Sequence, residues 1–244
     1  MSKISQLDLI SNSDISYDRI CTFRHITLND IKNIGLSKYD AYICTLHLDV
    51  ETINKICHVE FDSSSIDIFD ILVSDESLRN SVCEAFSFFI AGNVVFNQSY
   101  NTFAICKDGT NDVIGVINKD NFREVASGIF QLNFIPYDEL LETGNTSKKA
   151  KSILDKLKKG RAKLAKAKGG DSNINIPNMI SSIVAYGKNY TYENIWSLTV
   201  YQLYDLFFRL NAKTQFDIIG TRWSVWGKDE FDFSVWYKDP SKNK

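Results

Sequence analysis

Histidine and cysteine are the residue types in this chain that could hold a metal ion or act in catalysis. The three histidines are His25, His47 and His58, and Cys57 stands directly before His58. Zinc sites in small domains usually use closely spaced ligand pairs such as CxxC or HxxxH. Neither spacing occurs in the sequence. We therefore expect no metal site, and we expect the histidines to be surface or half-buried side chains.

Nucleophilic and acid–base chemistry also lack a matching pattern. The sequence has no GxSxG motif, and no family signature surrounds any cysteine. Gly115 is not followed by the glycine spacing that a phosphate-binding loop needs. The acidic pairs at 138–139 and 229–230 are explained by a helix N-terminus and a solvated loop. The sequence therefore predicts a protein that is not an enzyme and that needs no cofactor.

Composition sets the class of protein. The 244 residues suffice for one large or two small domains, and 44% apolar with 24% charged residues is typical of soluble globular proteins. No apolar run follows Met1, and no apolar stretch approaches the length of a membrane span. The five cysteines are odd in number and widely scattered, which is typical of reduced thiols in a cytoplasmic protein.

Positive charge is concentrated in one stretch, which we call the basic segment (residues 148–168). It contains ten Lys or Arg residues and one acidic residue, whereas the rest of the chain has 18 basic and 29 acidic residues. Its apolar residues form only a thin stripe on an otherwise cationic helical pattern. They are Ile153, Leu154, Leu157 and Leu164.

The basic segment has several interpretations. It could follow a nucleic-acid backbone, lie on anionic lipid, bind a partner protein, or serve as a solvated linker. Because it lacks aromatic and amide side chains that read bases, we favour a linker or a segment that docks against the acidic remainder of the chain. The alternative is a nucleic-acid-binding protein that uses this segment. The candidate contact residues in it are Lys156, Lys158, Lys159 and Arg161.

The N-terminal part predicts helices around a small sheet. The first dozen residues suggest a loose lead-in, and the run 65–73 fits a helix or a strand equally well. The turn at Asp108-Gly109 favours a β-hairpin. The other expected elements are a strand at 19–26, helices from Thr27 to Gly35, from Ser37 to Leu48, from Asp49, from Ser74 to Gly92 and from Asn118, and antiparallel strands at 94–98, 102–106 and 112–118.

Residues 177–213 predict a helix, a turn, a short helix and a strongly capped final helix. Thr199 and Gln202 have the spacing of a capping box, in which each side chain satisfies the other residue's backbone N–H. Four apolar residues spaced three and four apart behind this cap predict a buried face. They are Val200, Leu203, Phe207 and Leu210. On the flanks of the same helix, Tyr201 and Tyr204 are candidates for a contact surface with a partner protein.

Aromatic residues dominate the end of the chain. Three of the four tryptophans, Trp223, Trp226 and Trp236, lie in the last 22 residues, within segments that we interpret as alternating. Such residues could complete the core of a second domain or form an exposed anchor patch, because Trp and Tyr dominate binding hot spots. We favour completion of the core.

Two stretches resemble proteins of the tail module of phages and prophages of Gram-positive bacteria. ITLNDIKNIGLSKYDAYICTL is similar to the opening of such proteins, and ISSIVAYGKNYTYENIWSLTVYQLYDLFFRLNAKTQFDI is similar to their C-terminal segment. The resemblance covers about a third of the chain and rests on packing motifs, so it transfers no functional residue. It implies a tail assembly chaperone or a small tail-tip or baseplate component that binds other virion proteins and needs no cofactor.

Together these patterns predict a mostly helical α+β protein with three parts. An N-terminal domain with a small antiparallel sheet (1–145) is followed by a basic linker (146–173) and a compact helical C-terminal domain (174–244). We expect a non-enzymatic protein of phage tail morphogenesis. Its expected partners are other tail proteins, such as the tape measure and tail or baseplate components. It would act in the host cytoplasm during assembly or in the virion tail.

Overall fold

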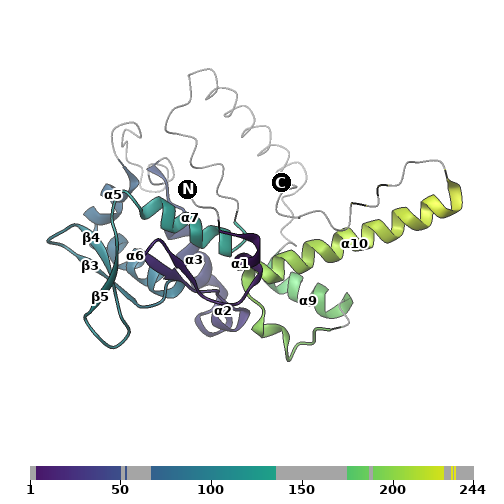
Figure 1. Cartoon of the computed structure of the whole chain (residues 1–244), viewed down its shortest axis with the longest axis horizontal. Coiled ribbons are helices and arrows are strands. Elements are labelled where there is room, and N and C mark those ends of the chain that lie inside the picture. The colour runs from purple at the N-terminus through teal and green to yellow at the C-terminus, as the bar shows by residue number, and fades with distance from the viewer. Residues whose placement is uncertain are drawn as a thin grey trace, which may run out of the picture. The chain divides into compact units, whose positions relative to one another are not determined.

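The computed structural model describes residues 4–50, 53, 67–135, 175–186, 189–227, 232 and 234. The chain divides into two compact units, Met1–Ile135 (unit 1) and Pro136–Lys244 (unit 2). The elements show that the fold is α+β and mostly helical, as predicted (Figure 1). The basic segment and the end of the aromatic tail lie outside the described residues.

Unit 1 combines short helices with two antiparallel sheets (Figure 1). One sheet has the order β1-β2 and the other has the order β3-β4-β5. The described elements, in chain order, are α1 (Gln6–Ile10), β1 (Ile15–Tyr17), β2 (Cys21–Phe23), α2 (Leu28–Ile34), α3 (Leu36–Leu46), α5 (Ile68–Ser74), α6 (Glu76–Phe89), β3 (Asn93–Asn97), β4 (Thr102–Cys106), β5 (Val113–Ile117) and α7 (Phe122–Leu132).

Side-chain caps set where the helices of unit 1 begin. The Thr27 hydroxyl accepts a hydrogen bond from the Asp30 N–H at 3.2 Å, and the Asp30 carboxylate accepts one from the Thr27 N–H at 2.9 Å. This capping box confirms the predicted start of α2. The undecided run 65–73 resolves as α5, because the Asp67 side chain caps it through the Phe69 N–H. Asp75, rather than Ser74, is the N-cap of α6.

The three-stranded sheet packs its inner face against helices. Phe103 of β4 is fully buried and lies in aromatic contact with Phe69 of α5 and Phe86 of α6, with ring centroids 5.9 Å and 6.0 Å apart. Phe122 of α7 contacts both of these helix rings at 5.6 Å. Edge-to-face rings at such distances add stabilisation beyond area burial. The predicted three strands and the turn at Gly109, which has φ +75°, are confirmed.

The N-terminal lead-in is more ordered than the sequence predicted. Ser5 caps α1 through the Asp8 N–H, and the strand predicted at 19–26 is shorter and pairs with β1. β1 was not predicted, because three residues are too few to show a period of two. Gly128 of α7 lies against the ring of Phe23, and a side chain there would collide with that ring.

Unit 2 is helical in its described part. Its elements are α9 (Ile176–Tyr186), the 3-10 helix η2 (Ile195–Ser197) and α10 (Val200–Trp226). This order confirms the prediction for residues 177–213. α10, however, continues beyond Lys213 and ends at Gly227, which adopts the left-handed conformation (φ 57°, ψ 18°) and donates to the Trp223 carbonyl. The alternating segments expected at 216–220 and 221–227 are therefore wrong, because residues 216–226 are helical and Gly227 ends the helix.

Candidate protein-binding surface

The first turns of α10 belong to the core of unit 2. Thr199 and Gln202 form the predicted capping box, with hydrogen bonds of 3.0 and 3.2 Å. Val200 and Leu203 are buried, and α10 contacts α9, whose buried residues include Met179. The capped start and the apolar face therefore fix the proximal end of α10 within unit 2.

The residues proposed as partner contacts lie close to this core. Tyr201 is only 3% exposed and Tyr204 is half-buried, so Tyr201 has little surface to offer a partner. Their role as contacts stays a prediction. Phe207 is half-buried and not fully in the core as expected, because the helix is leaving its neighbours at this turn. The other candidate contact residues, Lys156, Lys158, Lys159 and Arg161, lie outside the described residues.

An ion pair between Asp205 and Arg209 lies where the side chains of α10 change from buried to exposed. Asp205 is 7% exposed, and its carboxylate accepts a hydrogen bond from Arg209 Nε at 2.7 Å, one turn along the helix. A buried carboxylate needs such a partner because desolvation of an unpaired charge is costly. Beyond this pair, most side chains of α10 are exposed.

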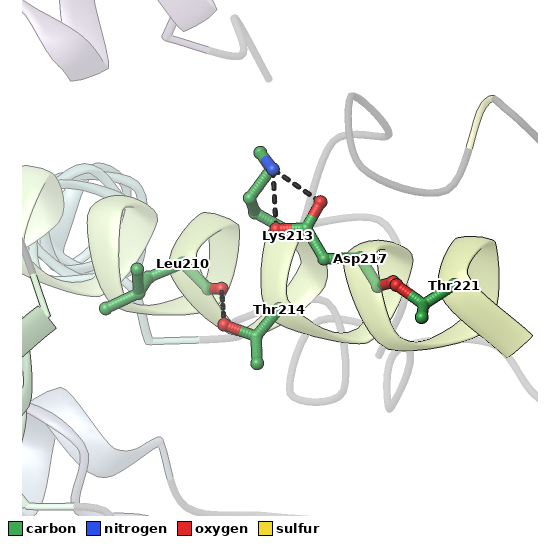
Figure 2. A network of polar contacts seen from close by, with 5 residues as sticks. All are labelled: Leu210, Lys213, Thr214, Asp217 and Thr221. Carbon is green, nitrogen blue, oxygen red and sulfur yellow. Dashed lines mark hydrogen bonds and ion pairs between the residues drawn. The ribbon is translucent and has the colours of Figure 1, made fainter.

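The distal half of α10 satisfies its polar side chains within the helix itself (Figure 2). Lys213 Nζ donates to both carboxylate oxygens of Asp217 at 2.6 Å. The hydroxyls of Thr214 and Thr221 donate to the carbonyls of Leu210 and Asp217 at 2.9 and 2.8 Å. These contacts use the i,i+4 spacing of the helix and require no neighbouring element.

Five exposed apolar side chains define what we call the distal surface. Ile219, Trp223 and Trp226 are spaced four and three apart and share one side of the helix, and Ile218 and Val225, which are seven apart, share the adjacent side. The exposed fractions are 64% for Ile218, 46% for Ile219, 44% for Trp223, 66% for Val225 and 69% for Trp226. The expectation that the aromatic tail completes a core is therefore wrong for Trp223 and Trp226.

The area of the distal surface suits a protein–protein interface. Full burial of a Trp removes about 200 Å² from water, and full burial of an Ile or Val removes about 90 Å². Scaled by the exposed fractions, the five side chains offer about 400 Å² of apolar area. One side of a standard interface covers about 800 Å², of which about 450 Å² is apolar. The distal surface alone could thus supply most of the apolar area of one stable interface.

The described histidine and cysteine side chains of unit 1 are not arranged as a catalytic or metal-binding site. His25 is 8% exposed, which corrects the expected surface or half-buried position, and burial lowers its pKa. Burial also raises the pKa of Cys21 to about 12 and that of Cys83 to about 11, so both thiols are protonated at neutral pH and are poor nucleophiles. Among the described residues, no group of three or more His, Cys, Asp or Glu side chains is placed to hold a metal ion.

No helix in the described part of the chain combines the length and the hydropathy needed to cross a bilayer.

One family model matches the chain. Residues 165–240 match the model of the YomV second domain, so the match lies entirely within unit 2 and includes α9, η2 and α10. This family is of the Bacillus phage and prophage type, and the likeness points to a phage-related protein. Neither the curated proteins nor the solved structures contain a match. No single sequence signal marks the whole distal surface: Ile218 and Val225 continue the predicted apolar face past Lys213, whereas Ile219, Trp223 and Trp226 lie beside it.

Proposed function

We propose that this chain is a phage tail morphogenesis protein that acts by binding other tail proteins and catalyses no reaction. Two kinds of evidence support the proposal: the likeness of unit 2 to a phage-type family, and the resemblance of residues 180–218 to the C-terminal segment of tail-module proteins. Within this role, the chain is either a tail assembly chaperone or a small component of the tail tip or baseplate.

The observation that carries the proposal is the distal surface of α10. Two exposed tryptophans, Trp223 and Trp226, lie on one side of a helix that is already ordered by its own polar contacts. Large, rigid aromatic side chains are the residues that most often dominate binding energy. A preformed helix also avoids part of the ordering cost of association. This surface would therefore present an amphipathic helix to a groove on a tail protein.

Deletion and complementation in the phage or prophage that encodes the chain test the proposal. Without the gene, electron microscopy of lysates should show filled heads that lack tails. The wild-type gene should restore tailed particles, and a gene carrying Ile219→Ser and Trp226→Gln should not. A matched control carries Leu7→Ser and Tyr186→Gln, which change two other exposed apolar residues, at 79% and 76%; it should restore tails like the wild type.

The possible outcomes test the role in tail morphogenesis separately from the assignment of the distal surface as the binding site. Normal tails in the deletion strain would refute the role in tail morphogenesis. Restoration by the Ile219→Ser, Trp226→Gln gene would refute the distal surface as the binding site and return attention to Tyr204 and its neighbours. Mass spectrometry of purified virions then distinguishes the two roles, because a chaperone is absent from finished particles and a structural component is present.

A further inference from the structure

Both edges of the three-stranded sheet in unit 1 carry hydrogen bonds to neighbouring segments. On the β3 edge, the Val94 N–H donates to the Ser87 hydroxyl of α6 at 2.8 Å. On β5, the Val116 carbonyl accepts a hydrogen bond from Asn121 Nδ2 at 3.0 Å. Because an incoming strand needs free backbone groups on an edge, this sheet is poorly suited to strand addition.

The outer face of the same sheet is open and apolar. Val95, Ala104 and Val116 are direct partners across β3, β4 and β5, on the side opposite the buried Phe103. Val95 and Val116 are 41% and 40% exposed, whereas Ala104 between them is 6% exposed. Because Ala104 is smaller than Val95 and Val116 on either side, the outer surface of the sheet is shallowest over β4. At the irregularity in β5, two further apolar side chains, Val113 and Ile114, are 57% and 55% exposed.

The size of this outer face excludes one class of occupant. With about 90 Å² for a fully buried Val or Ile, the four exposed side chains offer about 170 Å² of apolar area. One side of a stable dimer interface contains about 450 Å² of apolar area. The face therefore suits a single short element better than a second copy of the chain. Since β4 has five residues of about 3.3 Å each, a helix of about 11 residues spans it.

Charge further restricts the occupant. Residues 1–135 contain 18 acidic and ten basic residues, so two copies of unit 1 would repel each other. Four exposed aspartates lie in the segments next to β5: Asp18, Asp108, Asp112 and Asp120. Three exposed cations lie in the same segments, Arg19, Lys107 and Lys119, and Lys119 is paired with Asp70 at 2.6 Å. An occupant with positive charge on the side that faces β5 would be complementary.

We propose that the outer face of the β3-β4-β5 sheet binds one amphipathic α-helix of a partner protein. The apolar stripe of this helix lies along β4 over Ala104, between Val95 and Val116, and its Lys- or Arg-bearing flank faces β5. This inference is independent of the distal surface, which lies in unit 2, and of the proposed role in tail morphogenesis. It gives the chain a second contact site, with less exposed apolar area than the distal surface.

Fluorescence anisotropy on the full-length chain tests the proposal with three labelled 14-residue peptides. One has a leucine stripe and lysine flanks, one has the same stripe and glutamate flanks, and one has serine in place of leucine with lysine flanks. We expect micromolar binding of the Leu/Lys peptide and at least about tenfold weaker binding of the other two, because charge alone or apolar area alone is insufficient.

Sequence variants localise the binding. Val95→Thr with Val116→Thr keeps β-branched side chains that strands accept, and adds two hydroxyls to the outer face. This double variant should bind the Leu/Lys peptide at least about tenfold more weakly. A control, Leu7→Thr with Ile10→Thr on exposed positions of α1, should bind it like the wild type. Should the double variant lose its circular-dichroism signal, Val116→Thr alone is measured in the same way.

Three results would overturn the proposal. The first is equal binding of the Leu/Lys peptide by the wild type and the Thr variants, which would place the peptide elsewhere. The second is equal or tighter binding of the Leu/Glu peptide, which would remove the charge argument. The third is a wild-type dimer in analytical ultracentrifugation that the Thr variants convert to a monomer, which would assign the face to a second copy.

Discussion

The core of unit 1 and the distal half of α10 in unit 2 place their aromatic residues in opposite environments. In unit 1, six phenylalanines are among the largest fully buried side chains, and they contact one another and their neighbours across helices and strands. They are Phe23, Phe69, Phe86, Phe89, Phe103 and Phe130. In the described part of unit 2, Trp223 and Trp226 lie on an exposed helix instead. Aromatic rings therefore stabilise the core of unit 1, whereas those at the end of α10 expose apolar area to solvent.

This difference follows from how each unit satisfies its backbone. Unit 1 contains sheets, whose edges expose backbone groups, and the Ser87 side chain of α6 accepts a hydrogen bond from one of these groups, the Val94 N–H. α10 satisfies its backbone along its own axis, so its distal half can extend with little burial. A long helix can thus expose apolar side chains while all the backbone groups in its interior remain hydrogen-bonded. The comparison predicts large stability effects for core changes in unit 1 and small ones for distal changes in unit 2.

The strongest test of this comparison removes a ring from the core of unit 1. Phe103→Ala should lower the free energy of unfolding by about 3–5 kcal/mol, because the site is fully buried and closely surrounded by other rings. Urea unfolding followed by circular dichroism measures this. Tyr100→Ala, at a side chain 79% exposed, is the control and should change stability by less than about 0.5 kcal/mol. A loss below about 1 kcal/mol for Phe103→Ala would show that the cluster is not the core.

A second test compares two positions on α10. Leu203 is fully buried, so Leu203→Ala should cost about 2–5 kcal/mol, whereas Phe207→Ala at a half-buried side chain should cost less. Thermal or urea unfolding of unit 2, followed by tryptophan fluorescence, measures both. The reverse order would return Phe207 to the core, as the sequence had suggested.

Local signals were predictable from the sequence, and long-range ones were not. The capping boxes at Thr27 and Thr199 depend on two residues three apart, and both are confirmed. Similarly, Asp108-Gly109 marked the turn between β4 and β5. β2 lies within the strand predicted at 19–26, whereas β1 was missed because three residues are too few to show a period of two. The exposure of Trp223 and Trp226 depends on which elements cover α10, and this is a tertiary property.

The two capping boxes allow a matched comparison between units. Thr27→Ala and Thr199→Ala each remove a hydroxyl that accepts a backbone N–H, at 3.2 Å in both cases. Each should lower the free energy of unfolding by about 1 kcal/mol, within about 0.5–2 kcal/mol. Thr→Ser at the same positions keeps the acceptor and serves as the control. A much larger loss at one cap would show that its helix start is coupled to packing and not only to hydrogen bonding.

A smaller effect should appear as a pH dependence of unit 1. Burial lowers the pKa of His25 against the opposing effects of Asp14 and Asp8, so the folded chain favours the neutral ring more than the unfolded chain does. Below the ordinary pKa of 6.5, the unfolded chain takes up a proton that the folded chain resists. The free energy of unfolding should therefore fall as the pH falls from 7 to 5. His25→Gln should reduce this fall in urea titrations, and an unchanged slope would contradict the assignment.

The last comparison concerns the charge of the two units. Residues 1–135 are net acidic, whereas residues 136–244 are net basic, with 18 basic and 12 acidic residues. If the basic segment bound nucleic acid specifically, a variant with Gln at Lys156, Lys158, Lys159 and Arg161 would lose that binding, and wild-type affinity would fall steeply with salt. We expect only weak nonspecific retention of duplex or single-stranded DNA, no tighter than about 10⁻⁶ M at physiological salt, and hence little difference between wild type and variant. Filter binding at two salt concentrations measures both. Because nonspecific contacts already reach about 10⁻⁶ M, only tighter binding that the four substitutions abolish would make nucleic acid the better candidate partner.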